Sequence, residues 1–454
     1  MDRRLQCALP ILLAVATSGC VSTRQMAAPA QPFVPVSAAA TAAPQEHLFQ
    51  GIETLVLEVA LARVRTANPV LAAARSGMNV AAAGLRQARL LPNPTVTAAS
   101  EEIPINKFGN LGESVNTVSI SQEIVTAGKR KAAMAVADTE VTLAFLEFDV
   151  LQREMLTDTK KAFYALLAGQ ERLAATARLV EIARRSATAS QRRVDAGDAA
   201  PVDTVRAQLA LSQALIGHRQ ARVEQSNASV VLQELMGYSY GILPPVGPRD
   251  ALYELPPEAS SEDSLLLALE QHPATDLLEA GVALTNAEVV QARSEQWPNV
   301  EIGFGHESAP GETTGREESY GMEISFPLPL FDRNQVAVDA AKSAFVQAKQ
   351  ERQAGRVQLA TQLRQARHVY VAAREATENY RKQIVPGSRR VYDLVKRSYD
   401  AGEIDQLELL EAQQGLVEAE LTYIDNLASL MEAQADLESL TLTVAGGSTT
   451  KENE

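Results

Sequence analysis

Apolar residues recur every three or four positions through most of the chain, which predicts long amphipathic helices. The first such stretch starts at Glu53 and ends at Pro92, and it is interrupted at Asn68-Pro69, where the proline starts a second helix or kinks the first. Between Lys129 and Val194 the pattern continues without proline, which corresponds to roughly 100 Å of helix at about 1.5 Å per residue. A helix of that length needs lateral support from other helices, as in a coiled coil.

Two segments alternate apolar with small or polar residues instead, as half-buried strands do. They are predicted to form strand hairpins at 94–125 and 299–328. Each strand has about ten residues, the length of a transmembrane β-strand. A four-stranded sheet would leave the backbone groups of its two edges unpaired in hydrocarbon, so several chains have to combine their strands into a closed barrel. The alternative is a soluble antiparallel sheet that caps a coiled coil.

Two stretches of similar sequence indicate that the chain is duplicated. Residues 195–208 read DAGDAAPVDTVRAQ and residues 400–413 read DAGEIDQLELLEAQ, with five identities at an offset of 205 positions. Each stretch lies between two helical patterns, and a glycine flanked by small and acidic residues is typical of a helix end. Gly197 and Gly402 are therefore predicted to form the turns at the tips of two helical hairpins.

The duplication predicts the domain organisation and a mainly α fold class with a β-barrel portion. A signal peptide (1–19) and a lipid-anchored flexible leader (20–50) precede a first repeat (51–237) with its tip near 197, a connector (238–260), a second repeat (261–444) with its tip near 402, and a polar tail (445–454). In the second repeat, His272-Pro273 stands where the first has Asn68-Pro69. The second long helix is expected to break at Pro386-Gly387.

The N-terminus has the layout of a bacterial export signal. Arg3 and Arg4 precede an apolar run that is too short to span a membrane, and small residues stand directly before Cys20. This pattern resembles a lipobox, in which the cysteine receives lipid and becomes the mature N-terminus, although Thr17 stands where lipoboxes usually have leucine. Cys20 is therefore the predicted lipid anchor, with ordinary signal cleavage as the alternative. Val21 after it favours the outer membrane over the inner one.

Composition and charge exclude several classes of function. The formal charge of -14 and the absence of a basic cluster argue against nucleic-acid binding. Besides Cys20 the chain has only Cys7, inside the predicted signal, so no pair of thiols remains for a disulfide or a metal. The five histidines are scattered, and no recognisable catalytic motif is present. We therefore expect no enzyme activity, no cofactor and no dedicated metal site.

The repeated order of helices, strand hairpin, long helix, tip and return helix, from about residue 53 to 444, resembles the TolC family of outer membrane factors. QARLLPNP at 87–94, TAGKRKAA at 126–133 and FPLPLFDRNQ at 326–335 look most similar to the heavy-metal cation efflux branch typified by CzcC and CusC. The resemblance implies a homotrimer. Its three sheets would form a twelve-stranded β-barrel in the outer membrane, continuous with a periplasmic α-helical barrel.

The resemblance also implies partners and a function. The helical tips would close the tunnel at rest and open when a periplasmic adaptor protein docks onto them, which links the duct to an inner-membrane pump of the resistance-nodulation-division type. The expected function is export of heavy-metal cations. One alternative is the same duct serving drug efflux or type I protein secretion. The other, from a different class, is a lipid-anchored coiled-coil structural or adhesin protein without a pore.

The second tip carries the predicted gate. Asp405, Glu408 and Glu411 are spaced by three and lie on neighbouring faces of one helix. The resemblance implies that the last two point into the tunnel, where a trimer would gather each into an acidic ring that attracts cations. The alternative is a solvated acidic helix face. Tyr399 and Asp203 match positions at which the family holds its tips together.

One departure from the family pattern affects this gate. The basic residue that usually completes the network of the tips is replaced by Ile404. Closure is therefore expected to use other contacts, from Arg206, Arg192 or Arg397. Docking of the adaptor is assigned to the tips themselves, around the two glycines.

Overall fold

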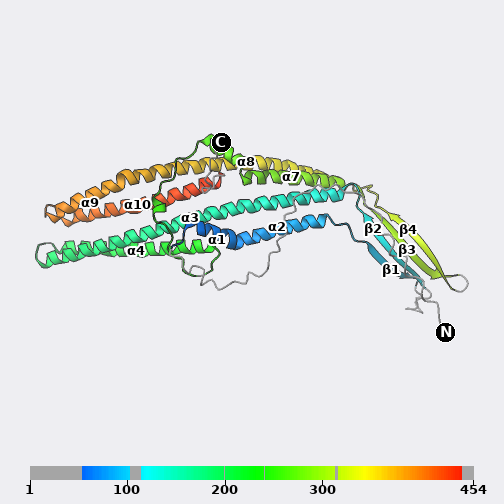
Figure 1. The fold of residues 1–454 in the computed structure, drawn as a ribbon, viewed down its shortest axis with the longest axis horizontal. Helices are drawn as coiled ribbons and strands as arrows, with labels where there is room; N and C mark the ends of the chain where they lie inside the picture. Colours follow the sequence, from blue (N-terminus) through cyan, green and yellow to red (C-terminus); the bar gives the residue numbers. More distant parts are fainter. Residues whose placement is uncertain (1–53, 103–113, 199, 240, 312–314, 442–454) are drawn as a thin grey trace, which may run out of the picture. The chain divides into compact units, whose positions relative to one another are not determined.

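The first half of the chain contains short helices, two strands and one long helical hairpin (Figure 1). The computed structural model describes residues 54–102, 114–198, 200–239, 241–311 and 315–441. The elements of the first half are α1 (Leu57–Ala67), α2 (Pro69–Ala88), β1 (Thr95–Glu101), β2 (Val115–Ile124), α3 (Lys129–Asp195) and α4 (Pro201–Leu235). The predicted signal peptide and leader, with Cys20, and the polar tail lie outside the described residues.

The second half repeats this order after a connector that contains one short helix. Its elements are α5 (Asp250–Tyr253), α6 (Glu262–Glu270), α7 (Pro273–Ser294), β3 (Val300–Pro310), β4 (Arg316–Ser325), α8 (Gln335–Asn379), the π-helical segment η3 (Tyr380–Ile384), α9 (Val385–Asp400) and α10 (Gln406–Ser439). The predicted fold class, mainly helical with a small β portion, is confirmed. Within the described residues, no helix is long and apolar enough to span a membrane.

The two repeats begin their second helices in the same way. Asn68 caps α2 by accepting hydrogen bonds from the N–H groups of the first turn, and its own amide donates to the Leu235 carbonyl at the end of α4, over 2.7 Å. His272 caps α7 by accepting from the Ala274 N–H through Nδ1, and its Nε2 lies 2.9 Å from the Ser439 carbonyl at the end of α10. In each repeat, one buried side chain therefore joins the start of a short helix to the end of the return helix.

The long helix of the second repeat does not break at Pro386-Gly387, contrary to the prediction. The chain stays helical through η3 and into α9, where the proline occupies the first turn. A proline lacks the N–H that an α-helix needs and crowds the carbonyl four residues before it. The π-helical turn directly upstream changes the hydrogen-bond pairing at this point. We infer that this rearrangement lets the helix accommodate Pro386 without ending.

The four strands form one antiparallel sheet in the order β1-β2-β3-β4. Residues that pair across strands share a face, so the register sorts the side chains into two sets. One face, called here the apolar face, is mainly hydrophobic: Val96, Ala98, Val118, Ile120, Ile124, Val300, Ile302, Phe304, Tyr320, Met322 and Ile324. Most of these large side chains are exposed to solvent in the single chain, and an exposed apolar surface of this extent indicates an interaction with lipid or protein.

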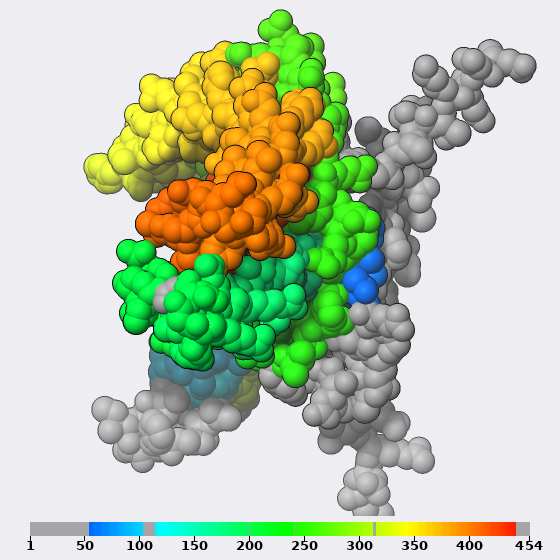
Figure 2. Space-filling model, turned by 90° about the vertical axis from the view of Figure 1, so that its left-hand side faces the viewer, coloured from blue at the N-terminus to red at the C-terminus, as the bar shows by residue number. Residues whose placement is uncertain are grey.

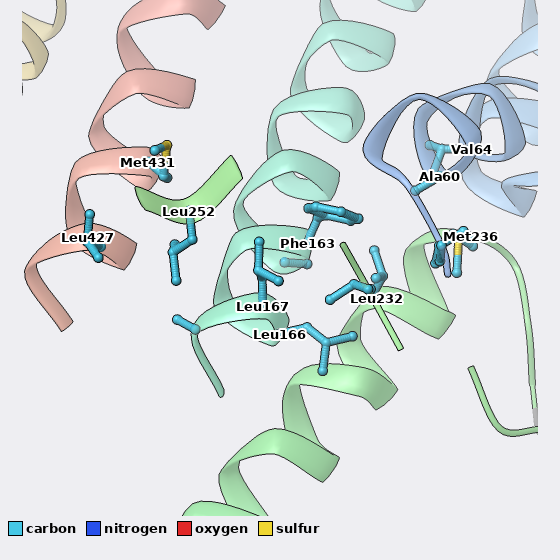
Figure 3. Close-up of a cluster of buried hydrophobic side chains, with 14 of the residues drawn as sticks. Ala60, Val64, Phe163, Leu166, Leu167, Leu232, Met236, Leu252, Leu427 and Met431 are labelled. Atoms are coloured by element: carbon cyan, nitrogen blue, oxygen red, sulfur yellow. The ribbon is translucent and has the colours of Figure 1, made fainter. Parts of the chain in front are cut away.

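The main hydrophobic core lies where the two repeats meet at the connector (Figure 3). Phe163, Leu166 and Leu167 of α3 lie at its centre and are almost completely buried. Around them pack side chains from several other elements: Ala60 and Val64 of α1, Leu232 of α4 and the following Met236, Leu252 of α5, and Leu427 and Met431 of α10. Helix α3 is therefore anchored at mid-length, while both of its ends extend beyond the core.

An ion pair between a buried carboxylate and an exposed arginine fastens the connector to α3. Glu171 is 4% exposed, and its carboxylate accepts hydrogen bonds from the Arg249 guanidinium and, over 3.1 Å, from the Tyr253 hydroxyl. Burial, together with the adjacent Glu171 charge, raises the pKa of Tyr253 to about 12. The connector between the repeats is therefore held to α3 by polar contacts as well as by the core.

Candidate functional site

Both hairpin tips close with the same glycine turn. Gly197 and Gly402 each have φ of +80°, which is the left-handed conformation that glycine adopts without steric cost. After the first long helix, the Gly197 N–H donates to the Val194 carbonyl and the Asp198 N–H donates to the Arg193 carbonyl. The second tip makes the equivalent pair of bonds. This pattern is a Schellman motif, so both glycines have a structural role as helix terminators.

The helices that leave the two tips start differently. At the second tip, the Asp405 carboxylate accepts hydrogen bonds from the N–H groups of Leu407 and Glu408, at 2.8 and 3.2 Å, and so caps α10. At the first tip, Ala200 has no side chain to cap α4, and Pro201 occupies the first helical position instead. The structure therefore gives Asp405, predicted as a gate residue, a defined structural role at the second tip.

A polar contact joins the two hairpins close to their tips. Arg193 of α3 donates a hydrogen bond of 2.9 Å to the Tyr399 hydroxyl of α9, and its guanidinium carbon lies 5.3 Å from the centre of the Tyr399 ring. Figure 2 views this end of the molecule, where the green and orange segments of the two hairpins lie side by side. The partner of Tyr399 in the structure is therefore Arg193, which the sequence analysis did not name, and closure of the tips through Arg206, Arg192 or Arg397 stays a prediction.

The other predicted tip residues do not join this contact. Asp203 lies on the first turn of α4 and faces Arg206 at 3.9 Å, three residues along the same helix. Arg397 donates instead to the backbone carbonyl of Asp393, one turn before it in α9. Ion pairs between exposed neighbours in one helix stabilise little, so the Asp203 pair is a local feature of the first tip.

Glu408 and Glu411 lie on the exposed side of α10. Gln406 and Gln413 are 7% and 6% exposed and mark the side of the helix that packs against the rest of the chain. Neither glutamate forms an ion pair within the described residues, so both carboxylates are available to solvent or to another chain. The described residues contain no group of three or more histidine, cysteine, aspartate or glutamate side chains that could hold a metal ion.

The sheet carries a second set of carboxylates that sequence reasoning missed. The face opposite the apolar face, called here the acidic face, has six glutamates among small and hydroxyl residues: Glu101, Glu123, Glu301, Glu307, Glu317 and Glu323. Among the strand residues on this face there is no lysine or arginine. Part of this pattern is visible in the sequence, because Glu301 and Glu323 each stand between two apolar residues. Only the strand register shows that the six glutamates share one face.

A polar cluster joins the end of the acidic face to the helices. Lys129, at the start of α3, donates a hydrogen bond of 2.8 Å to the Asn299 carbonyl oxygen and lies 3.3 Å from Glu295. The Asn299 amide donates in turn to Glu123, over 2.6 Å. Glu301 pairs with Glu123 across the strands, and like charges directly opposite each other are destabilising. A cavity of about 950 Å³ borders this cluster and the loop before α8.

Sequence comparison identifies the class of protein. The sequence model described as outer membrane efflux protein matches residues 60–238 and 265–441, which correspond to the two structural repeats. The chain belongs to the outer membrane efflux protein family. Members of this family are the outer-membrane channels of tripartite efflux systems, so the protein is a channel component and not an enzyme. The family assignment excludes the alternative of a coiled-coil adhesin without a pore.

Individual relatives and a solved structure agree with the family. The chain is 26% identical to the cobalt-zinc-cadmium resistance protein CzcC of Cupriavidus metallidurans over 387 residues, which are 85% of this chain and 90% of that protein. It is also 26% identical to the protein CyaE of Bordetella pertussis, over 98% of this chain and 95% of that one. Its fold is similar to a crystal structure of CusC, with a TM-score of 0.70 at 16% identity, covering 85% and 92% of the two chains.

Proposed function

We propose that three copies of this chain form the outer-membrane duct of a tripartite efflux system that exports heavy-metal cations. A periplasmic adaptor protein would dock onto the hairpin tips and connect the duct to an inner-membrane pump of the resistance-nodulation-division type. The similarity to CzcC supports metal cations as cargo. Drugs or a secreted polypeptide are the alternative cargo for the same duct.

The edges of the sheet support a closed oligomer. Each chain has one unpaired edge at β1 and another at β4. In hydrocarbon, each unpaired N–H and C=O group would cost several kcal/mol, so the edges have to pair with other chains. Because the strands alternate in direction, β4 of one copy can pair antiparallel with β1 of the next. Three copies would then close a twelve-stranded barrel.

The observation that carries the choice of cargo is the acidic face of the sheet. A barrel whose apolar face contacts lipid has its other face toward the lumen. Each chain would therefore place six glutamates, with no basic strand residue among them, along the pore. Rings of carboxylates attract cations and repel anions. A cation between Glu123 and Glu301 would also offset the repulsion of this cross-strand pair.

The tip residues would add a second acidic zone. In a trimer, the exposed Glu408 and Glu411 side chains would each occur three times around the tunnel, next to the turns that the adaptor contacts. We also propose that Cys20 carries the lipid that anchors the chain to the outer membrane, as its sequence context suggests. Replacing Cys20 by alanine should abolish labelling with radioactive palmitate.

Complementation of a deletion strain tests the cargo. The wild-type gene should restore resistance to zinc, cobalt and cadmium, whereas Glu301→Gln/Glu323→Gln and Glu408→Gln/Glu411→Gln should each restore it only in part. Asp263→Asn on α6 removes one charge away from both acidic zones and serves as the control. In planar bilayers, the same double variants should show a lower cation-to-anion permeability ratio. If the deletion strain keeps its metal resistance but becomes sensitive to organic dyes, the proposed cargo is wrong.

A further inference from the structure

A groove lies at the point where α7 leads into β3. Its volume is about 600 Å³, and it is lined by Val290, Arg293 and Trp297 together with Thr126 and Ala127. Trp297 is 66% exposed and Val290 is 52% exposed. Large apolar side chains beside an arginine on an open surface are typical of a binding site or a membrane interface.

The polar cluster at the end of the sheet shows on which side this groove lies. Arg293 and Glu295 are two positions apart at the end of α7, so their side chains point in nearly opposite directions. Glu295 contacts Lys129, and the same cluster reaches Glu123 on the acidic face through Asn299. Arg293 therefore points away from this cluster, and we infer that it lies on the side of the apolar face, whereas Trp297 and Pro298 line both the groove and the cavity beside the cluster.

The groove also lies at a defined level along the sheet. Ile124 and Val300 form the last cross-strand pair of the apolar face before the helices. Thr126 and Pro298, which line the groove, each lie two residues beyond this pair, a distance of about 7 Å along a strand. If the apolar face contacts the hydrocarbon of a bilayer, the groove is at the depth of the lipid headgroups. Tryptophan and basic residues are enriched at that depth in membrane proteins.

Basic side chains collect at this level in both repeats. The two repeats share the sequence QAR, at 87–89 and at 291–293. Arg89 therefore has the same position at the end of α2 as Arg293 has at the end of α7. Arg130 and Lys131 are exposed at the start of α3. Within the described part of the chain, none of these four side chains has an ion-pair or side-chain hydrogen-bond partner. Their charges are therefore available to an anionic ligand.

We propose that this groove binds the phosphate-bearing headgroup of an anionic phospholipid in the periplasmic leaflet of the outer membrane. The Arg293 guanidinium contacts the phosphate, and Trp297 lies at the boundary between headgroup and acyl chain. Arg89 provides an equivalent contact in the first repeat. This assignment rests on the proposed function, because it requires the sheet to lie in a bilayer. Its chemical basis is the combination of unpaired basic groups and an exposed indole directly below the apolar face.

The position of Trp297 provides a direct test, because it is the only tryptophan in the sequence. The full-length protein is reconstituted in vesicles of phosphatidylcholine and phosphatidylglycerol, with bromine on the upper acyl carbons of one lipid at a time. Brominated phosphatidylglycerol should quench Trp297 at lower mole fraction than brominated phosphatidylcholine does. Arg293→Gln should reduce this preference about fivefold. One basic residue near an anionic surface contributes about 1 kcal/mol of binding free energy, which corresponds to about a fivefold change in affinity. Arg390→Gln on α9 removes the same charge far from the sheet and should leave the preference unchanged.

Three outcomes would overturn the assignment. The first is equal quenching of the wild-type protein by the two lipids, and the second is a preference for phosphatidylglycerol that survives in the Arg293→Gln variant. The third is displacement of the brominated lipid by millimolar inorganic phosphate, which would indicate a site for free anions. Channel conductance measured in the same vesicles separates this proposal from the proposed function. Normal conductance without a headgroup preference removes the lipid site alone, whereas absence of conductance contradicts the duct.

Discussion

His272 makes the same two types of contact as Asn68, but a histidine side chain can gain a proton in mild acid. Burial lowers the pKa of His272, and nearby Arg153 adds to this effect, although the hydrogen bond to Ser439 opposes it. The unfolded chain therefore binds the proton more readily than the folded chain does. The stabilisation by neutral His272 is complete above the unfolded-state pKa of about 6.5 and is lost as the pH falls from there to the lower folded-state pKa.

Replacing His272 by asparagine should remove this pH dependence. Asparagine can accept from the first turn of α7 and donate to the Ser439 carbonyl, as Asn68 does in the first repeat. Above neutral pH, the unfolding temperature of the variant should lie within a few degrees of that of the wild type. Near pH 5.5 it should be the more stable protein by about 1 kcal/mol, the typical value of a helix N-cap. Thermal unfolding followed by circular dichroism between pH 5 and 8 measures both.

The reverse substitution is the matched control. Asn68→His should add a second acid-sensitive cap, so the loss of stability at low pH should be larger than in the wild type. If His272→Asn shows the same pH profile as the wild type, the acid sensitivity arises elsewhere in the chain.

At the scale of the elements, the two long hairpins differ in how firmly their ends are held. Side chains of α3 are buried along most of its length, down to Ser190 near the tip, whereas α9 has no buried residue. Helix α9 packs against α10. Among the described residues, its one polar side-chain contact with the first hairpin is that between Tyr399 and Arg193. This contact is therefore well placed to keep the second tip closed against the first.

Tyr399→Phe keeps the aromatic ring and removes the hydrogen bond from Arg193. If the contact stabilises the closed tip by about 1 kcal/mol, the ratio of open to closed channels should rise about fivefold. Single-channel recording in planar bilayers measures this ratio. Tyr392→Phe, two turns earlier in α9, removes a hydroxyl that has no hydrogen-bond partner among the residues that the structure describes, and it should leave the ratio unchanged. Equal effects of the two substitutions would show that Tyr399 has no special role in closure.

The sequence predicts most elements but not all of their details, for physical reasons. Apolar spacing distinguishes helix from strand over long segments, and the glycine at each tip has a local steric requirement, so the fold class and the turns could be predicted. The continuity of the helix through Pro386 could not be predicted, because it depends on the hydrogen-bond pairing of the backbone in the preceding turn. The partner of Tyr399 was also beyond prediction, because Arg193 is 206 residues away in the sequence.

At the scale of the whole molecule, the two faces of the sheet are the basis of the orientation in the membrane that we propose. The alternation of side chains was visible in the sequence, but the common face of the six glutamates required the strand register. If the apolar face contacts lipid and the acidic face lines the pore, neighbouring residues on one strand should respond in opposite ways to the same charge. Ser119 and Ile120 of β2 provide this comparison, because they lie on the acidic and the apolar face respectively.

Ile120→Lys should prevent stable insertion, because a lysine facing lipid near the bilayer midplane costs about 2–4 kcal/mol. Ser119→Lys should insert normally, because on the proposed orientation its side chain would point into the pore. It should also lower the cation-to-anion permeability ratio, because each of three chains would gain a positive charge there. The amount of protein in outer-membrane fractions measures insertion, and reversal potentials in a potassium chloride gradient measure selectivity. If the Ile120→Lys protein inserts normally while the Ser119→Lys protein is missing from the outer-membrane fraction, the two faces have the opposite orientation.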